Sequence, residues 1–417
     1  MNTEWIHTKF FAALDWASDH HDVIVVDQHG GLVADFRFVH SASGWAEFNE
    51  SMKGFPGCPV AIETSNGPAV DQLLQRGYSV YPVNPKAAAR YRERKVPSGT
   101  KTDHHDAWSL AEALRTDGQG WRPLLPQDEA TTTLRLLCRD EIELIEQRTA
   151  LINQLQAALR EYYPVALESF NDWTYPYTWA FVRAFPTPVA LRQAGRRKWE
   201  KFLHVHRLWR VQTSQRRLEL FAQAEALPAS AAVVAAKSLL AVSLATLLET
   251  LQRQLDEYRH RITDAFQSHP DHDVFGSLPG AGPKLAPRLL GGLGSRRELF
   301  PDSDSLMCWA GVSPVSFQSG QIRKAHLRRA CDHFLRYTIH LWADQSRQSS
   351  PWAQAYYRTK RAAGHSHASA LRCLGKRWLK ILWRLWQNRE HYCEERHINN
   401  LQHRDSPTWR QLHIQMV

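Results

Sequence analysis

Residues 10–39, FFAALDWASDHHDVIVVDQHGGLVADFRFV, decide how the N-terminal part of the chain folds. Three segments within it, 10–16, 22–27 and 32–39, are apolar or β-branched, and polar or turn-forming residues separate them. Such segments favour strands, and short connections between them favour antiparallel pairing. The sequence therefore predicts a three-stranded antiparallel meander.

Helix and strand signals alternate in the chain that follows. A helical pattern over 43–52 precedes a short buried strand over 59–64, a helix over 70–76 and a strand over 78–83. Three strands followed by helix, strand, helix, strand and helix predict an α/β domain. We assign residues 1–125 to this domain and expect it to be RNase H-like (RuvC-like).

Four carboxylates occupy the ends of these elements. Asp15 and Glu63 end two strands that we expect to be neighbours, and Asp103 and Asp106 begin a helix with a spacing that places both on one face. Acids brought to one point repel one another unless divalent cations neutralise them. Carboxylate oxygens favour Mg²⁺ or Mn²⁺ over zinc, and two such ions suit in-line attack on a phosphodiester. Taken singly, each acid is better explained as a strand end or a helix cap, and only the four together favour the metal site.

The middle of the chain, 126–270, is long and helical. The apolar periodicity over 128–162 and 212–266 predicts two long stretches that pair as an antiparallel coiled coil. The region serves either as a spacer or in dimerisation. Its most apolar part, 231–248, contains Lys237 and several hydroxyl side chains, so we expect a buried or paired helix rather than a membrane span.

Residues 271–390 predict a mostly helical domain that begins with a glycine-rich turn. The run Leu-Pro-Gly280-Ala-Gly282-Pro-Lys284 is similar to the turn of a helix-hairpin-helix element. Glycines let backbone N–H groups approach a phosphate closely, and Lys284 adds a positive charge. A simple Gly-Pro loop before a helix explains the same run equally well.

A serine and a basic run follow in the same domain. Ser319 lies at the end of a loop over 311–320, and we expect a basic helix after it. A hydroxyl in such a loop can be presented to a phosphate, and nearby cations stabilise the charge that develops there. On spacing alone, an ordinary turn serine explains Ser319 better. The cations of the run are Arg323, Lys324, His326, Arg328, Arg329 and Arg336.

The end of the chain predicts an amphipathic helix over 368–388 and a polar, loosely ordered tail over 391–417. Over the whole chain, 52 Lys and Arg against 42 Asp and Glu give a formal net charge of +10, which indicates a polyanionic partner such as nucleic acid. The six cysteines have no Cys-x-x-Cys spacing, and the N-terminus has no signal-peptide pattern. We therefore expect a cytoplasmic protein with no membrane partner.

Taken in order, these motifs resemble the DEDD transposases of the insertion-sequence-one-ten family, which are described as bridge-RNA-guided recombinases. The resemblance covers roughly residues 8–390. The motifs that carry it are Ala-Leu-Asp15-Trp, Ala-Ile-Glu63-Thr-Ser, Lys-Thr-Asp103-His-His-Asp106-Ala, Leu-Pro-Gly280-Ala-Gly282-Pro, Trp-Ala-Gly311-Val-Ser-Pro and Gln-Ser319-Gly320 with the basic run after it.

The resemblance implies a mechanism. Asp15, Glu63, Asp103 and Asp106 correspond to the acidic tetrad that holds Mg²⁺, and Ser319 corresponds to a serine that becomes covalently linked to DNA. It further implies an active site shared between subunits of a homodimer or tetramer. A structured RNA then pairs with both donor and target DNA, while the protein reads backbone shape.

Two other functions remain open from the sequence. The first is a metal-dependent endonuclease of the Holliday-junction type, in which Ser319 is incidental. The second is a non-enzymatic nucleic-acid-binding protein derived from a transposase. The presence of all four acids and the serine argues against the second, because loss of function removes the selection that keeps them.

Overall fold

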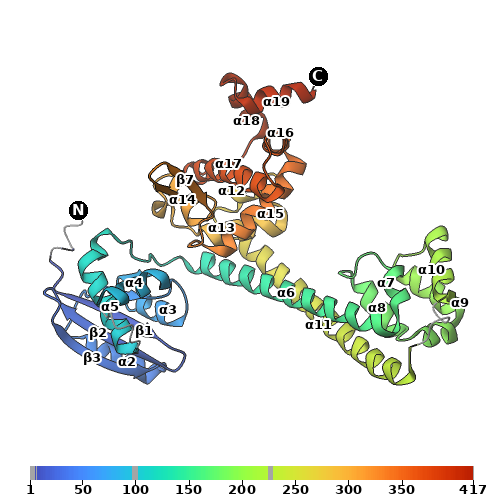
Figure 1. The fold of residues 1–417 in the computed structure, drawn as a ribbon, viewed down its shortest axis with the longest axis horizontal. Coiled ribbons are helices and arrows are strands. Elements are labelled where there is room, and N and C mark those ends of the chain that lie inside the picture. The colour runs from blue at the N-terminus through green and yellow to red at the C-terminus, as the bar shows by residue number, and fades with distance from the viewer. Residues whose placement is uncertain (1–4, 6, 96–101, 224–228, 417) are drawn as a thin grey trace. The chain divides into compact units, whose positions relative to one another are not determined.

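The computed structural model describes residues 5, 7–95, 102–223 and 229–416. The chain divides into two compact units, Met1–Gln127 and Asp128–Val417 (Figure 1). The first unit is a mixed α/β domain, and the second is mostly helical. Each unit has its own buried clusters of apolar side chains.

The first unit is built on a five-stranded sheet in the order β3-β2-β1-β4-β5. β1 pairs antiparallel with β2, and β2 with β3, whereas β1–β4 and β4–β5 are parallel. Its elements are β1 (Phe10–Trp16), β2 (His20–Asp27), β3 (Leu32–Val39), α2 (Ala42–Met52), β4 (Val60–Ile62), α3 (Pro68–Gln75), β5 (Val80–Pro82), α4 (Pro85–Lys95), α5 (Asp103–Asp117) and the short 3₁₀ helix η1 (Gly118–Gly120).

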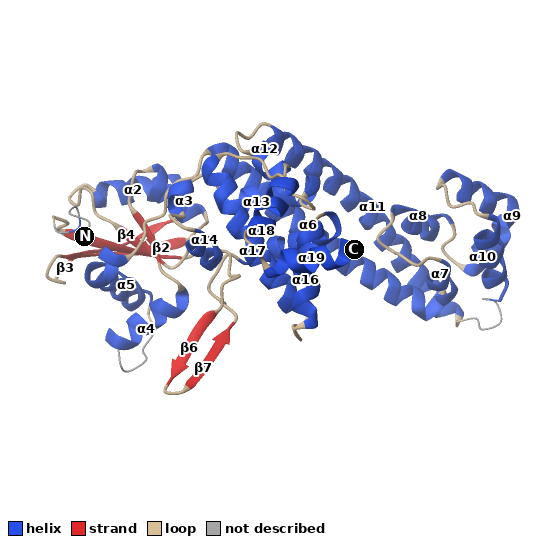
Figure 2. Ribbon diagram, turned by 90° about the horizontal axis from the view of Figure 1, so that it is seen from above, coloured by secondary structure: helices blue, strands red, loops and turns tan. Residues whose placement is uncertain are grey.

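The antiparallel meander is confirmed, and its alternating side chains explain why both faces of the sheet are covered. Ala12 and Leu14 of β1 face the cluster that includes side chains of α2 and α3. Phe11 and Ala13 face the opposite cluster, which includes side chains of α4 and α5. Figure 2 shows helices on both sides of this sheet. The strands β1 and β4 are therefore buried on both faces, which accounts for their nearly continuous apolar sequence.

Two long helices, α6 (Glu129–Tyr162) and α11 (Ala231–Gln267), lie side by side in the second unit (Figure 1). Glu161 accepts a hydrogen bond from Lys237 at 2.6 Å, and Glu141, near the other end of α6, pairs with Arg259 at 3.2 Å. These contacts show that the helices are antiparallel. The expected single helical stretch over 212–266 is wrong, because α10 (Val211–Gln223) ends before α11 begins at a Ser230 cap.

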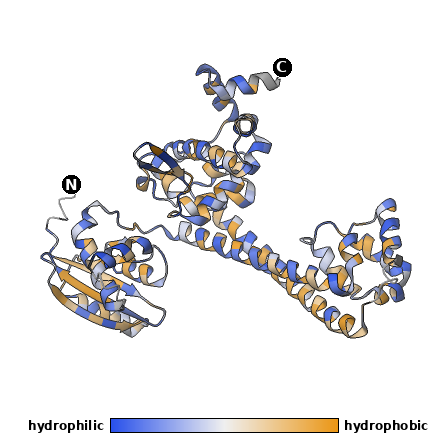
Figure 3. Ribbon diagram, in the orientation of Figure 1, coloured by the Kyte–Doolittle hydropathy of each residue, from blue (hydrophilic) through white to orange (hydrophobic). Residues whose placement is uncertain are grey.

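Among the described residues, one helix, α11, is long and apolar enough to cross a membrane, with 22% of its most apolar window buried. The first half of α11 carries most of its apolar residues. One face of this half joins Ala241, Leu244 and Leu248 to the core formed with α6, α7 (Pro164–Ser169), α8 (Pro176–Ala184) and α9 (Pro188–Val205). Its other face leaves Leu239 and Leu247 exposed. Figure 3 shows the apolar character of this helix. A single apolar helix that packs in this way is weak support for a membrane span.

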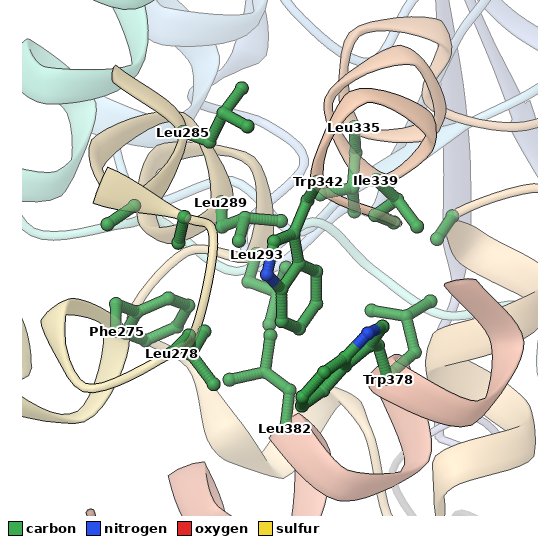
Figure 4. Close-up of a cluster of buried hydrophobic side chains, with 14 of the residues drawn as sticks. Phe275, Leu278, Leu285, Leu289, Leu293, Leu335, Ile339, Trp342, Trp378 and Leu382 are labelled. Atoms are coloured by element: carbon green, nitrogen blue, oxygen red, sulfur yellow. The ribbon is translucent and has the colours of Figure 1, made fainter. Parts of the chain in front are cut away.

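The remaining helices enclose the largest core, which is centred on Trp342 and Trp378 (Figure 4). The Trp378 indole donates a hydrogen bond to Ser346, and the Trp342 indole donates to the carbonyl of Pro279, so these buried polar groups are satisfied. The elements are α12 (His272–Gly276), α13 (Gly282–Leu293), η3 (Arg297–Leu299), α14 (Ser303–Trp309), β6 (Val315–Ser319), β7 (Ile322–His326), α15 (His333–Ser349), α16 (Pro351–Ala362), α17 (His367–Asn388), α18 (Glu394–His403) and α19 (Pro407–Met416).

Two expectations for this unit are wrong. The residues after Gly320 form strand β7 rather than a basic helix, because Val315–Ser319 and Ile322–His326 pair as an antiparallel hairpin. The tail is not loosely ordered, because it forms α18 and α19 and is anchored by polar contacts. Tyr392 donates a hydrogen bond to Glu394 and accepts one from the Trp352 indole, and Ser350 also donates to Glu394.

Candidate functional site

Asp15 and Glu63 lie at adjacent positions on neighbouring strands. Leu14 of β1 is in register with Ile62 of β4, so the next residue on each chain segment is one of the two acids. Adjacent strands are about 4.8 Å apart. Asp15 has the same parity as Phe11 and Ala13, which places its side chain on the face covered by α4 and α5.

Helix α5 brings the other two acids to the same edge of the sheet. Near its C-terminus, Arg115 donates a hydrogen bond to the carbonyl of Gln28, in the turn next to the start of β1. The helix therefore runs antiparallel to β1, and its N-terminus lies towards the end of β1 that carries Asp15. Ala107 and Leu110 of α5 are buried in the cluster against the sheet. Asp106 precedes them on the same helical face and is 7% exposed.

The helix begins where the sequence predicts. The Thr102 side chain accepts a hydrogen bond from the backbone N–H of His105 and caps the first turn. Asp103 is therefore the first helical residue rather than the cap, and its backbone lies one turn before Asp106. The side chain of Asp103 lies outside the described part of the structure.

A residue that sequence reasoning missed, Arg92, lies among these acids. Its guanidinium donates a hydrogen bond of 2.7 Å to the Asp106 carboxylate. This bond, and further the charge of Glu63, raise the pKa of Arg92. Arg92 thus balances negative charge at the edge where Glu63 and Asp106 approach each other. Its place one turn after the buried Ala88 is the only signal that separates it from the exposed Arg90 and Arg94 of the same helix.

Asp15, Glu63 and Asp106 thus share one edge of the sheet with the N-terminus of α5, which favours bound negative charge through its dipole. Within the described residues, no group of three or more His, Cys, Asp or Glu side chains is close enough together to hold a metal ion. The Asp103 side chain is outside that set. The tetrad therefore stays a prediction.

Ser319 is the last residue of β6, beside the two-residue turn Gly320–Gln321. Gly320 has φ of 56°, a value that glycine adopts without strain, and a positive φ at the first turn residue suits a tight hairpin connection. All residues of β6 and β7 are exposed. The turn thus presents Ser319 to solvent at the tip of a hairpin that Figure 2 shows extending from the helices of this unit.

The glycine-rich run over 278–284 connects α12 to α13 and is partly explained by packing. A Cβ atom on Gly280 would lie 2.6 Å from the backbone nitrogen of Ser346, so this glycine allows α15 to approach. Gly282 has open space around it, and both Gly282 and Lys284 are exposed. Of the three predicted phosphate contacts, Gly282 and Lys284 have surfaces suited to that role, and Gly280 has a structural one.

The basic run is divided between the hairpin and the loop after it. Arg323 and Lys324 are exposed on β7, and Arg329 is exposed beyond it. Arg328 is half-buried and donates a hydrogen bond to the carbonyl of Ser313. Arg336 lies on α15, where it bonds the carbonyl of Arg328 at 2.9 Å and anchors the base of the hairpin.

Comparison with known proteins gives these two sites a family. A model described as "Transposase", whose name carries the DEDD motif, matches residues 12–164, and a model described as "Transposase IS116/IS110/IS902 family" matches residues 272–358. The chain is 34% identical over 409 residues to the mini-circle putative transposase for IS117 of Streptomyces coelicolor, covering 93% of this chain and 96% of that protein. The chain belongs to the IS110 family of transposases.

Other relatives of this transposase span different shares of it. A putative transposase of Sinorhizobium fredii, y4uE, is 33% identical over 206 residues, which are 48% of this chain and 57% of the relative. The uncharacterised protein of insertion element IS116 from Streptomyces clavuligerus is 24% identical over 387 residues, 92% of this chain and 96% of its own length. The transposase is therefore similar along nearly its whole length to proteins of insertion elements.

Proposed function

We propose that this transposase cuts and rejoins the donor and target DNA of its insertion element, with Ser319 as the nucleophile and a Mg²⁺- or Mn²⁺-binding site formed by Asp15, Glu63, Asp103 and Asp106. The observation that carries the proposal is the register of β1 and β4, which places Asp15 and Glu63 side by side at the edge that the N-terminus of α5 reaches. The mixed sheet around them supports an RNase H-like fold.

The residues at this edge fit a divalent cation. All four ligands are carboxylates, the donors that Mg²⁺ and Mn²⁺ prefer. Arg92 hydrogen-bonds Asp106 and interacts with Glu63, so the edge already attracts positive charge. When bound, the ions would stabilise charge on the phosphate oxygens during attack. The acids of the chain hold and orient these ions.

Ser319 supplies the covalent step. Its Oγ forms a bond to the phosphorus of the scissile phosphodiester, and the bond from phosphorus to one strand oxygen breaks. The leaving oxygen takes up a proton as the serine loses one, so the strand end is an alcohol. Attack by a second strand's hydroxyl reverses these steps, releases the serine and rejoins the DNA, with no external energy source.

The partners follow from charge and exposed surface. The net charge of +10 suits DNA together with a structured guide RNA, which would read sequence by base pairing. The exposed Leu239 and Leu247 of α11 support a homodimer or tetramer, because an apolar helical face in water favours pairing with another copy. In such an assembly, the acids and Ser319 would come from different subunits.

A second function is favoured by one observation. All four acids belong to the first unit, whereas Ser319 belongs to the second. A metal-dependent endonuclease of the Holliday-junction type needs only the first set. Water would then attack the phosphate, and Ser319 would have no chemical role.

A covalent-adduct trap tests the choice. Cells would express the protein with the DNA that flanks its element and a target plasmid, and denaturation would then reveal DNA attached to protein. Ser319→Ala should abolish the adduct. Ser316→Ala is the matched control, because Ser316 is an exposed serine on the same strand whose side chain lies on the opposite face of the hairpin.

The outcomes separate the two functions. An adduct in wild type and Ser316→Ala that disappears in Ser319→Ala supports the serine mechanism. An adduct that persists in Ser319→Ala removes Ser319 as the nucleophile. DNA that is cut in all three proteins without any adduct favours the endonuclease.

A further inference from the structure

The β6–β7 hairpin has an unusual surface for a folded protein. An isolated pair of strands is marginally stable in water unless one face packs on something. Here every residue of both strands is exposed, including Phe317 at 54% and Ile322 at 55%. Exposed apolar side chains gathered on one element mark an interaction surface.

The two faces of the hairpin differ in chemistry. In an antiparallel pair, residues in register project to the same face. Ser316 pairs with Ala325, and Gln318 pairs with Arg323, so one face is mostly polar and carries no large apolar side chain. The other face, which we call the Ser319 face, carries all the large apolar side chains of the hairpin. Its residues are Val315, Phe317, Ser319, Ile322, Lys324 and His326.

Charge identifies the partner as nucleic acid. The stretch 305–331 contains no Asp or Glu, and Arg323, Lys324, Arg328 and Arg329 all lie within it. An acid-free basic surface with an exposed aromatic ring suits a polyanion that also offers planar rings for stacking. DNA is favoured over RNA because, under the proposed function, Ser319 on the same face reacts with DNA.

We propose that the Ser319 face docks DNA at the scissile phosphate, with Phe317 stacked on a base and Lys324 held against the backbone. Phe317 and Ser319 are two residues apart on one strand, roughly 7 Å along it. Stacked nucleotides advance about 3.4 Å per step on one strand. The base that Phe317 contacts is therefore one or two nucleotides from the phosphate that Ser319 attacks.

This arrangement makes Phe317 a positioning residue and explains the hairpin's exposure. Base–aromatic stacking tolerates any sequence, because every base has a π face. Phe317 can thus fix the distance between the strand and the Ser319 hydroxyl while sequence choice is left to other components. The inference rests on the proposed function for the choice of DNA over RNA and for the identity of the reacting phosphate.

Site-specific photocrosslinking tests the face directly. The full-length protein, co-expressed with its element's flanking DNA, would carry p-benzoylphenylalanine at either of two neighbouring positions, Phe317 or Gln318. The probe is a labelled duplex that spans the element's end. Crosslinks to DNA from position 317 should exceed those from position 318 several-fold, because the two side chains lie on opposite faces of one strand.

Three results would overturn the proposal: equal crosslinking from the two positions, crosslinks from 317 to RNA, or crosslinks from 317 to a second protein chain. A binding measurement supplies an independent check. Phe317→Ala should weaken binding of the same duplex roughly tenfold, the effect of losing one stacked base, and Phe317→Trp should retain it. Unchanged binding by Phe317→Ala would contradict the stacking role.

The failure of this inference can be told from failure of the proposed function. The crosslinks would be repeated in a Ser319→Ala background, where no covalent adduct can form through the serine. Face-specific DNA crosslinks that persist there support docking whatever the adduct trap shows. If the adduct depends on Ser319 but the crosslinks are not face-specific, the serine mechanism survives and the Phe317 proposal does not.

Discussion

The carboxylate edge of the first unit and the Ser319 hairpin of the second are organised in opposite ways. β1 and β4, which place Asp15 and Glu63, are buried on both faces, and Arg92 balances the charge of Asp106. The hairpin is exposed on both faces, and its positive charge has no acid within 305–331. The fold itself positions the acids, whereas both strands of the hairpin that carries Ser319 are exposed along their whole length. Under the proposed function, the transposase would pair a site whose backbone the fold positions with one that its substrate completes.

The largest expected effect concerns the carboxylate edge. Asp15→Asn should lower DNA strand cleavage by at least about a hundredfold, as does loss of other groups that stabilise transition-state charge. Asp22→Asn is the matched control. Asp22 is the cross-strand neighbour of Asp15, but its carboxylate is held by two 2.9 Å hydrogen bonds from Arg37. Gel assays of nicked and joined products would measure both. Similar losses in the two variants would refute a specific role for Asp15.

A second prediction concerns the counter-charge at the same edge. Arg92→Ala leaves the buried Asp106 carboxylate without its partner, and should lower the free energy of unfolding by roughly 1.5–3 kcal/mol. Added Mn²⁺ should then raise the melting temperature of Arg92→Ala more than that of wild type, because the ion takes over the charge balance. Scanning calorimetry with Mn²⁺ or with EDTA would measure this.

The control for this prediction is Arg94→Ala, which removes an exposed arginine from the same helix and should change stability by less than about 0.5 kcal/mol. If Arg92→Ala loses stability but Mn²⁺ adds no more than it does in wild type, Arg92 is a structural partner of Asp106, and the metal-binding prediction is weakened.

The contrast between the two regions also explains what the sequence could predict. The strands of the first unit are predicted by β-branched, alternating residues. Asp15 and Glu63 are predicted because each is the first acid after a run of buried strand residues. Both signals are local. The inward position of Arg92 is not a local property, because Arg90, Arg92 and Arg94 look equivalent until the sheet selects one face of α4.

The hairpin was predicted as a loop and a basic helix for a related reason. Its apolar alternation, Val315 and Phe317, is short and is followed by cations that are equally common on exposed helices. Only the tight turn at Gly320 favours a pair of strands over a loop and a helix. The order of the tail was missed because its polar sequence gives no sign of the hydrogen bonds that join Tyr392 to Trp352 and Glu394 to Ser350.

A third, smaller effect concerns a buried histidine of the first unit. His21 is fully buried, and its ring is 2.8 Å from that of His40. Burial, and further the charges of His40 and His20, lower the pKa of His21 from 6.5 to about 4, against the opposing effect of Asp22 and Asp19. The folded state therefore keeps this ring neutral. The contribution of His21 to the free energy of unfolding is fully present above pH 6.5 and is lost as the pH falls towards 4. At pH 5.5 the loss is about 1 kcal/mol.

Urea unfolding of wild type and His21→Phe at pH 7.5 and 5.5 would measure that loss, and His21→Phe should reduce the difference between the two pH values by about 1 kcal/mol. Replacing the exposed His29 by Ala should leave the difference intact. If His21→Phe does not change the pH dependence, other titrating groups of the protein cause it.

The smallest effect concerns the hairpin and distinguishes its charge from its aromatic ring. Lys324 is exposed on the Ser319 face, so it should contact phosphate without selecting sequence. Each phosphate contact contributes about one to the slope of log K against log salt concentration, and Lys324→Gln should reduce that slope by about one. Phe317→Ala should weaken binding and leave the slope unchanged, because stacking releases no counterions.

Anisotropy titrations of one labelled duplex over a range of salt concentrations would measure both variants. The control is Lys53→Gln, which removes an exposed lysine of the first unit that pairs with Glu50. If Lys324→Gln and Lys53→Gln change the slope equally, charge is spread over the protein and the hairpin has no special share in DNA binding; if only Lys324→Gln changes it, the exposed hairpin is where substrate completes the second site.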